Sequence, residues 1–199
     1  RGHGLHEFIC DGHLNCADSQ DKDLLAKFNI THILSIHDTA KPVLEDMKYR
    51  CISASDHPKQ NLMPYFKDSI VFIHESRLQG GGCLVHCVAG VSRSVTLVVA
   101  YLMTVTGLGW VDCLAAVRAA RPCARPNLGF LRQLEEYENL DLAQVSPIHQ
   151  GMSVRFYCRL YRNPFNDHEE IKALLDRKSQ DNSDAMATSI VAPMATSRT

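Results

Sequence analysis

Residues 83–106, CLVHCVAGVSRSVTLVVAYLMTVT, decide the fold of this 199-residue chain. The first three are apolar and predict a short buried strand, whereas residues 92–106 are almost wholly apolar and predict a buried helix. In the connection between them, residues 88–92 (VAGVS) have small or unobstructive side chains. Strands that alternate with helices form a parallel or mixed sheet covered by helices. We therefore predict an α/β protein with this loop at a strand-to-helix junction.

The rest of the chain supports the same fold class. Two further strands are predicted at 30–36 and 49–54, each followed by a polar turn. Apolar residues at helical spacing predict helices at 19–28, 62–78, 110–120, 128–137 and 165–175. Ser19 or Asp18 is the expected N-cap of the first helix, and Asn166 or Asp167 that of the last. The whole pattern predicts a central mixed, mostly parallel sheet flanked by helices.

The composition divides the chain into four parts. Its length fits one domain of about 150 residues with a tail. We predict an irregular N-terminal segment at 1–18, a folded domain at 19–140 and a divergent C-terminal extension at 141–177. Residues 178–199 are rich in Ser, Thr, Ala and Asp with little apolar periodicity, so this tail is predicted to be disordered.

The overall charge and the cysteine content indicate which partners and which cellular location to expect. A formal net charge of −1 gives no electrostatic reason to expect nucleic acid or a membrane surface as the main partner. No apolar run approaches the roughly 20 residues that a membrane-spanning helix needs. The 8 cysteines are a high count, but the chain is too large for a disulfide scaffold, and several of them lie within apolar patterns. We therefore expect a reducing, cytoplasmic location that could extend to the nucleus.

Cys87 and Arg93 form the constellation that carries chemistry. A nucleophilic cysteine attacks as its thiolate, which needs donors that stabilise the anion. The loop after Cys87 can turn its backbone N–H groups inward at the start of a helix, and this geometry favours both a thiolate and a phosphate dianion. Arg93, in the first helical turn, can bind two phosphate oxygens through its planar guanidinium.

The sequence from His86 to Ser94, HCVAGVSRS, resembles the HCxxGxxRS signature of cysteine-dependent protein phosphatases, in the HCxAGxSRS form typical of dual-specificity phosphatases. The resemblance continues through ITHILSIHD, the SASD turn, VTLVVAYLMTVTGLGW and RPCARPNLGFLRQLEEY. It is closest to the small atypical members that include JNK-stimulatory phosphatases. It implies that the domain at 19–140 is catalytic and hydrolyses phosphotyrosine and phosphoserine/threonine on proteins through phosphocysteine, in MAP-kinase (JNK) signalling.

The resemblance also implies roles for single residues of the loop. Cys87 would be the nucleophile, and Arg93 would bind the phosphate and the transition state. Ser94 would hydrogen-bond the sulfur, although it is also an ordinary residue for the start of a helix. His86 would hydrogen-bond the backbone around Cys87. The phosphate would be held by Val88, Ala89, Gly90, Val91, Ser92 and Arg93.

Two residues outside the loop complete the implied site. Asp56, at the exit of the second strand, would protonate the leaving group and then activate water. The alternatives are that Asp56 is an ordinary turn residue, or that Asp38 or Asp46 is the acid, although both are less well placed relative to the strand ends. Asn127 would help to order the phosphate loop, unless it is a plain turn residue. The implied reaction requires neither a metal nor a cofactor, and its partners would be phosphorylated proteins, including MAP-kinase pathway components.

Two features near the N-terminus suggest other chemistry. Zinc is the first, because the candidate ligands His3, His6, Cys10, His13 and Cys16 lie close together, although their spacing matches no standard finger. The second is N-myristoylation at Gly2, which would bring membrane association; Arg1 before it and His6 after it do not fit the motif.

Two rival functions remain open. A lipid phosphatase of this type tends to carry lysines inside the loop, where this chain has uncharged residues. A catalytically silent phosphate-binding or scaffold protein would be expected to have lost the nucleophile, the arginine or the acid, and all three are present.

Overall fold

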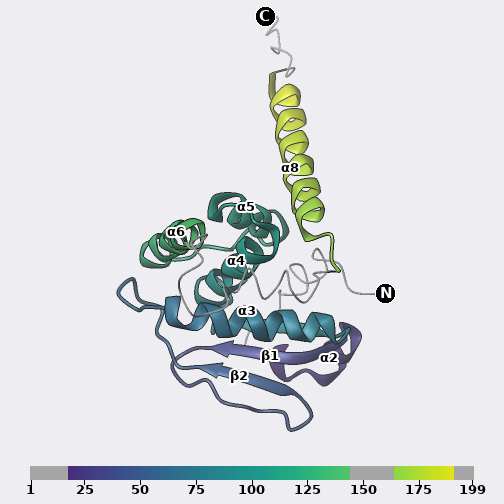
Figure 1. Cartoon of the computed structure of the whole chain (residues 1–199). Coiled ribbons are helices and arrows are strands. Elements are labelled where there is room, and N and C mark those ends of the chain that lie inside the picture. The colour runs from purple at the N-terminus through teal and green to yellow at the C-terminus, as the bar shows by residue number, and fades with distance from the viewer. Residues whose placement is uncertain (1–17, 144–163, 191–199) are drawn as a thin grey trace, which may run out of the picture.

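Within residues 18–143 and 164–190, three parallel strands form one sheet, in the order β2–β1–β3. The central strand β1 (Ile30–Ile36) pairs with β2 (Lys48–Ile52) on one side and with β3 (Gly82–His86) on the other. The computed structural model describes residues 18–143 and 164–190, and both strand pairings in these residues are parallel (Figure 1). The predicted α/β class is confirmed.

The sheet separates two apolar cores because side chains alternate along β1. Leu34 and Ile36 face the larger core, which is built with α3 (Met63–Leu78) and α4 (Arg93–Thr106). Ile33 faces the smaller core, which α2 (Lys22–Lys27) covers. A strand exposes successive residues to opposite faces, so one apolar strand supplies both cores.

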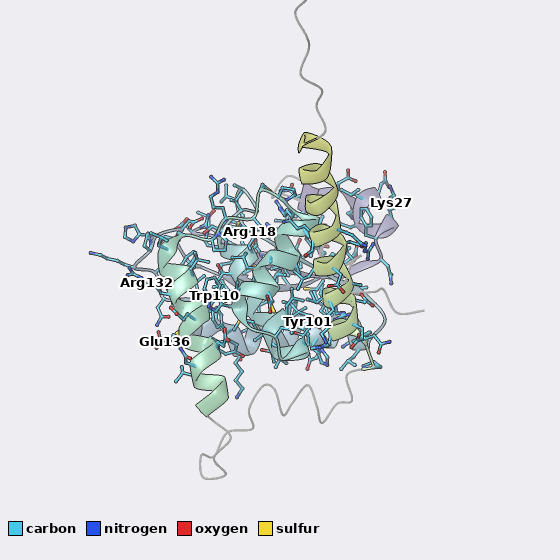
Figure 2. The ribbon with its side chains drawn as sticks, turned by 90° about the horizontal axis from the view of Figure 1, so that it is seen from above. Lys27, Tyr101, Trp110, Arg118, Arg132 and Glu136 are labelled. Atoms are coloured by element: carbon cyan, nitrogen blue, oxygen red, sulfur yellow. The ribbon has the colours of Figure 1, made fainter. Side chains whose placement is uncertain are left out.

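Helix α4 lies at the centre of the larger core, and eleven of its residues are buried. Around it pack α3, α5 (Trp110–Ala120), α6 (Leu128–Ala143) and α8 (Asp167–Ile190), as Figure 1 shows. In Figure 2 the side chains of Arg132 and Glu136 point away from the body, on the outer face of α6. A buried helix surrounded by other helices is held rigidly, so its first turn has a fixed direction.

The first predicted helix is interrupted in the structure. Residues Asp18–Gln20 form a 3-10 turn, and α2 then begins after Asp21, whose Oδ1 accepts hydrogen bonds from the backbone N–H groups of Asp23 (3.1 Å) and Leu24 (3.0 Å). The predicted N-caps, Ser19 and Asp18, were therefore wrong. Aspartate is a favourable N-cap residue because its carboxylate accepts hydrogen bonds from the first-turn N–H groups, which have no partner within the helix.

The last helix is longer than predicted. Helix α8 runs from Asp167 to Ile190, so the short helix at 165–175 and the disordered tail from 178 are replaced by one helix through residue 190. In Figure 1 its C-terminal part extends away from the other helices. Two buried side chains, Ile171 and Leu174, pack into the larger core and attach the first turns of α8 to it. Packing of these turns against the core stabilises the start of the helix, and the composition of residues 178–190 does not show this.

Some predictions lie outside the described residues. These are the candidate zinc ligands between His3 and Cys16, the myristoylation site at Gly2, and most of the divergent extension. Across 18–143 and 164–190, no single helix has both the length and the hydropathy of a membrane span.

Candidate active site

The carboxyl ends of the three parallel strands meet at one edge of the sheet, and the chemistry-bearing residues follow them there. Asp38 lies two residues after β1, Asp56 four residues after β2, and Cys87 directly after β3. Ligands of open parallel sheets bind at this edge, because the connections to the next elements gather there. The topology thus brings together residues that are far apart in the sequence.

Cys87 is buried with donors directed at its sulfur. The backbone N–H of Gly90 donates to Sγ at 3.2 Å, and the hydroxyl of Ser94 lies 3.3 Å from it. Burial alone raises the pKa of the Cys87 thiol, but the Ser94 hydroxyl and the backbone N–H groups of Ser94, Gly90 and Val91 outweigh it and hold the pKa below the ordinary value. The site therefore favours the reactive thiolate.

The loop between Cys87 and α4 has the conformation that an anion nest requires. Gly90 adopts a positive φ of 64°, which places it in the left-handed region that glycine tolerates. Val88 is 56% exposed and Ala89 is also exposed, whereas Gly90 is buried beneath them. The exposed residues form the mouth of the loop, and the backbone N–H groups of Gly90 and Val91 face the sulfur.

The N-terminus of α4 has no side-chain cap, although a serine occupies the capping position. The hydroxyl of Ser92 instead donates to Asp56 Oδ1 at 2.8 Å and accepts from the backbone N–H of Asn127 at 3.2 Å. A serine at this position ordinarily accepts from the first-turn N–H groups. Because Ser92 is engaged elsewhere, those N–H groups and the positive end of the helix dipole remain available to an anion.

His86 supports the loop from beneath. Its Nδ1 lies 3.1 Å from the carbonyl oxygen of Cys87, and since that oxygen can only accept, Nδ1 carries the hydrogen. Burial lowers the pKa of His86, opposed by the bond to the Cys87 carbonyl and assisted by His37. A neutral imidazole with a fixed tautomer therefore holds the Cys87 backbone.

Arg93 is buried, with its guanidinium held at one end. Its Nη1 donates to the carbonyl of Ala54 at 2.9 Å and to Asp38 Oδ2 at 3.2 Å. Among the described residues, its Nε is buried without a hydrogen-bond partner, with Asp56 Oδ2 3.9 Å away. A buried donor without a partner is costly and commonly marks a place that a ligand fills.

Asp56 is positioned by two donors that reach the same carboxylate oxygen. Ser92 Oγ and Asn127 Nδ2 each donate to Oδ1 at 2.8 Å. The side chain of Asp56 is 37% exposed, so it remains open to solvent and substrate. Asn127 thus connects residues 53–62, the loop that carries Asp56 (the acid loop), to the start of α6, and its backbone N–H donates to Ser92. Hydrogen bonds thus join Asp56, Ser92 and Asn127 in one group and Cys87, Gly90 and Ser94 in another, whereas Val88 and Ala89 lie exposed at the mouth of the loop.

Three residues that the sequence argument did not select also shape the site. Gly129 packs so closely on the backbone of Pro58 that an added Cβ would collide with it, which fixes α6 against the acid loop. Arg121 places its guanidinium against Gly90, where a Cβ would meet it. Asp38 contacts Arg93, whereas Asp46 is 83% exposed and pairs with Lys22. The spacing of residues along the sequence does not predict these contacts, because each contact joins two elements that are far apart in the chain.

The arrangement can bind a tetrahedral anion between a thiolate and an arginine, with a carboxyl group at the rim. Across the described ranges, no group of three or more His, Cys, Asp or Glu side chains is placed to hold a metal ion. The parts suit nucleophilic attack on a phosphate followed by proton transfer to the leaving oxygen.

Comparisons with known proteins identify the family of the chain. The family model described as the dual specificity phosphatase catalytic domain matches residues 13–140. Dual specificity protein phosphatase 22-B of Danio rerio is 54% identical over 180 residues, which cover 89% of this chain and 94% of that protein. Dual specificity protein phosphatase 22 of Homo sapiens is 50% identical over 175 residues, covering 87% and 91%.

A solved structure shows the same fold. The crystal structure of DUSP15 superposes with a TM-score of 0.64 at 45% sequence identity, and the match covers 77% of this chain and 90% of that one. The family model spans more than half of the chain, and the relatives are matched over most of their length. The chain therefore belongs to the dual-specificity protein phosphatase family, among its small atypical members, and is a protein-tyrosine/serine/threonine phosphatase.

Proposed function

We propose that the chain hydrolyses protein phosphomonoesters in two steps, with Cys87 as the nucleophile. The observation that carries this proposal is the buried Cys87 thiol, whose pKa is lowered by Ser94 and by loop N–H groups beside an arginine with a buried, open donor. In the first step the thiolate attacks phosphorus, an S–P bond forms, and the bond from phosphorus to the substrate oxygen breaks. Arg93 and the loop N–H groups stabilise the charge on the transferring oxygens.

Asp56 supplies the proton for the leaving oxygen, and its contacts indicate which oxygen carries that proton. Oδ1 already accepts hydrogen bonds from Ser92 and Asn127, so protonation falls on Oδ2. In the second step the ionised carboxylate accepts a proton from water, which attacks phosphorus and breaks the S–P bond. The same oxygen thus serves as acid and then as base.

Ser94 assists the second step. Its hydroxyl lies 3.3 Å from Sγ, so it can donate to the sulfur as the thiolate departs. A hydrogen bond to the anionic thiolate is stronger than one to the uncharged, phosphorus-bonded sulfur of phosphocysteine. Cys87 is therefore a better leaving group in the presence of Ser94.

The uncharged loop favours proteins as substrates. Val88 and Ala89 are exposed at the mouth and carry no charge that would meet the additional phosphates of an inositol lipid. Among phosphoproteins, we propose components of the MAP-kinase (JNK) pathway as substrates and the cytoplasm as the place of action. The support is the family relationship to dual specificity protein phosphatase 22.

The chemical test uses an aryl phosphate with wild type and Cys87→Ser protein. Wild type is expected to turn it over, while Cys87→Ser loses activity by at least about 10³-fold because the hydroxyl is not ionised at neutral pH. Acid quenching during turnover should capture phosphate bound to Cys87, detected by mass spectrometry of the peptide. Equal inactivity of both proteins would support the silent phosphate-binding alternative and refute the proposed enzyme mechanism.

The substrate test uses Asp56→Ala protein as a trap. Without the proton donor, turnover falls while phosphate binding persists, so phosphoproteins of a stimulated cell extract should be retained and then released by vanadate. Recovery of phosphorylated JNK-pathway kinases would support the pathway proposal. If vanadate-releasable proteins lack these kinases, the JNK proposal is wrong, whereas the chemistry above is unaffected.

A further inference from the structure

We infer that Asp38 is a positioning residue for phosphoryl transfer, which acts by fixing the rotation of the Arg93 guanidinium. This inference rests on the proposed role of Arg93 and extends it to a residue outside both the phosphate loop and the acid loop. The defining contact is the 3.2 Å hydrogen bond from Arg93 Nη1 to Asp38 Oδ2.

The backbone of Asp38 is held at the active-site edge of the sheet. The N–H of His37 donates to the carbonyl of Ile52 at 3.1 Å, which extends the β1–β2 pairing by one bond. The hydroxyl of Ser53 donates to the carbonyl oxygen of Asp38 at 3.2 Å. Two contacts to the exit of β2 thus hold Asp38 beside the segment that leads to Asp56.

Asp38 and Ala54 bind the same nitrogen of Arg93. Nη1 has two hydrogens, and one points at the Ala54 carbonyl at 2.9 Å while the other points at Asp38. With both occupied, the edge formed by Nε and Nη2 remains for the anion, and this is the edge that can present two parallel N–H groups. The unpaired, buried Nε lies on this edge.

The exposure of the two partners differs, which argues against a purely structural ion pair. The side chain of Arg93 is 7% exposed, whereas that of Asp38 is 65% exposed. An exposed carboxylate gains little stability from such a pair because water screens it. The contact therefore has more effect on the direction of the guanidinium than on the stability of the fold.

The negative charge of Asp38 and its positioning role predict opposite changes in anion affinity when the side chain is removed. A carboxylate near a phosphate site repels the dianion, so removal of its charge alone would tighten the binding of anions. If Asp38 instead positions Arg93, its removal weakens the binding of an anion that needs both parallel N–H groups. Vanadate is the suitable probe, because it adopts five-coordinate geometry when a thiolate adds to it.

The experiment compares Asp38→Ala and Asp38→Asn with wild type, with Asp46→Ala as the matched control from the same β1–β2 connection. We expect Asp38→Ala to lose about fivefold to tenfold in kcat and in vanadate affinity, the scale of one solvent-exposed charged hydrogen bond. Asp38→Asn keeps an acceptor oxygen and should lose only about twofold. Asp46→Ala should match wild type, since Asp46 contacts Lys22 away from the site.

Two further measurements separate positioning from other causes. The pH midpoint for alkylation of Cys87 by iodoacetate should be the same in Asp38→Ala and wild type, because Asp38 does not touch the sulfur. In an Arg93→Lys background, Asp38→Ala should cost no further activity, because an ammonium group has no edge to orient. Unchanged kcat, or vanadate binding that is equal or tighter in Asp38→Ala, would overturn the inference. Failure of the proposed mechanism would appear separately, as turnover that survives in Cys87→Ser.

Discussion

Two buried arginines, Arg93 and Arg77, face aspartates in this protein and have opposite environments. Arg77 donates from Nη1 and Nη2 to the two carboxylate oxygens of Asp167, at 3.0 and 2.8 Å, and from Nη1 to the hydroxyl of Tyr101 at 2.7 Å. The ring of Phe165 stacks on its guanidinium at 4.0 Å from the ring centroid. Asp167 is 1% exposed, whereas Asp38, the partner of Arg93, is 65% exposed.

This difference in environment indicates that Arg77 stabilises the fold and that Arg93 binds the substrate anion. Arg77 and Asp167 are 90 positions apart and attach the start of α8 to α3 and α4, where Figure 2 shows Tyr101 beside α8. Arg93 leaves Nε buried without a hydrogen bond and so retains binding capacity for a ligand. A buried arginine whose N–H groups are paired with protein acceptors stabilises one arrangement of the chain. A buried arginine with an unpaired N–H group can donate that hydrogen bond to an anion.

The largest effect is expected from Arg93→Ala. Loss of the Nε and Nη2 donors to the transferring phosphate should lower kcat by about 10³-fold or more. The free energy of unfolding should change by less than about 1 kcal/mol, because the lost bonds at Nη1 are offset by removal of an unpaired buried donor. Aryl phosphate kinetics and urea denaturation measure the two quantities. A large loss of stability would show that Arg93 resembles Arg77, and the comparison would fail.

The next effect is expected from Asp167→Ala. It leaves the charge of Arg77 buried without its carboxylate, which should lower the free energy of unfolding by about 3 kcal/mol or more. At a temperature where the protein stays folded, kcat should remain within about twofold of wild type, since the cluster does not touch the site.

The double variant Arg77→Met, Asp167→Leu serves as the control for that prediction. It removes both charges together and should recover much of the lost stability. If Asp167→Ala instead abolished activity in folded protein, the Arg77–Asp167 pair would serve catalysis as well as the fold.

A smaller effect is expected from Asn127→Ala, which removes one of the two donors to Asp56 Oδ1. The acid should lose orientation and kcat should fall by about tenfold, the scale of one hydrogen bond to a charged group. Arg132→Ala, on the exposed face of the same helix, should behave as wild type. Equal rates for Asn127→Ala and wild type would make Asn127 a plain turn residue.

The smallest effect concerns pH and His74, which lies beside Arg77. Burial lowers the pKa of His74, and the positive charge of Arg77 lowers it further, opposed by Asp167 and Glu75. Between the lowered pKa and the ordinary value near 6.5, the unfolded chain binds more protons than the folded one. The free energy of unfolding should therefore fall as pH decreases from about 7 to about 5.

Urea denaturation of wild type and His74→Gln across this pH range provides the measurement. His32, His37 and His86 also have lowered pKa values, so the variant should reduce the pH dependence without abolishing it. An identical slope in both proteins would show that His74 does not contribute.

Local sequence identified the parts of the site whose spacing is short. Cys87, Arg93 and the loop between them belong to one strand–loop–helix unit, so their spacing alone places the sulfur and the guanidinium around one anion. The almost wholly apolar stretch from 92 to 106 likewise indicated the buried helix correctly, which the structure places at Arg93–Thr106. It could not indicate that Ser92 would leave α4 uncapped and donate to Asp56, because the choice of partner depends on a loop 36 positions earlier.

What the sequence by itself determined is therefore the α/β class, the phosphate loop and the family, because these depend on periodicity and on a motif within a few residues. Tertiary structure alone decided the pairing of Arg93 with Asp38, 55 positions apart, and that of Arg77 with Asp167, which gives α8 its attachment. Parallel strands bring their carboxyl ends to one edge wherever they lie in the chain. Which carboxylate then faces which arginine is set by register and packing, and neither leaves a local signal.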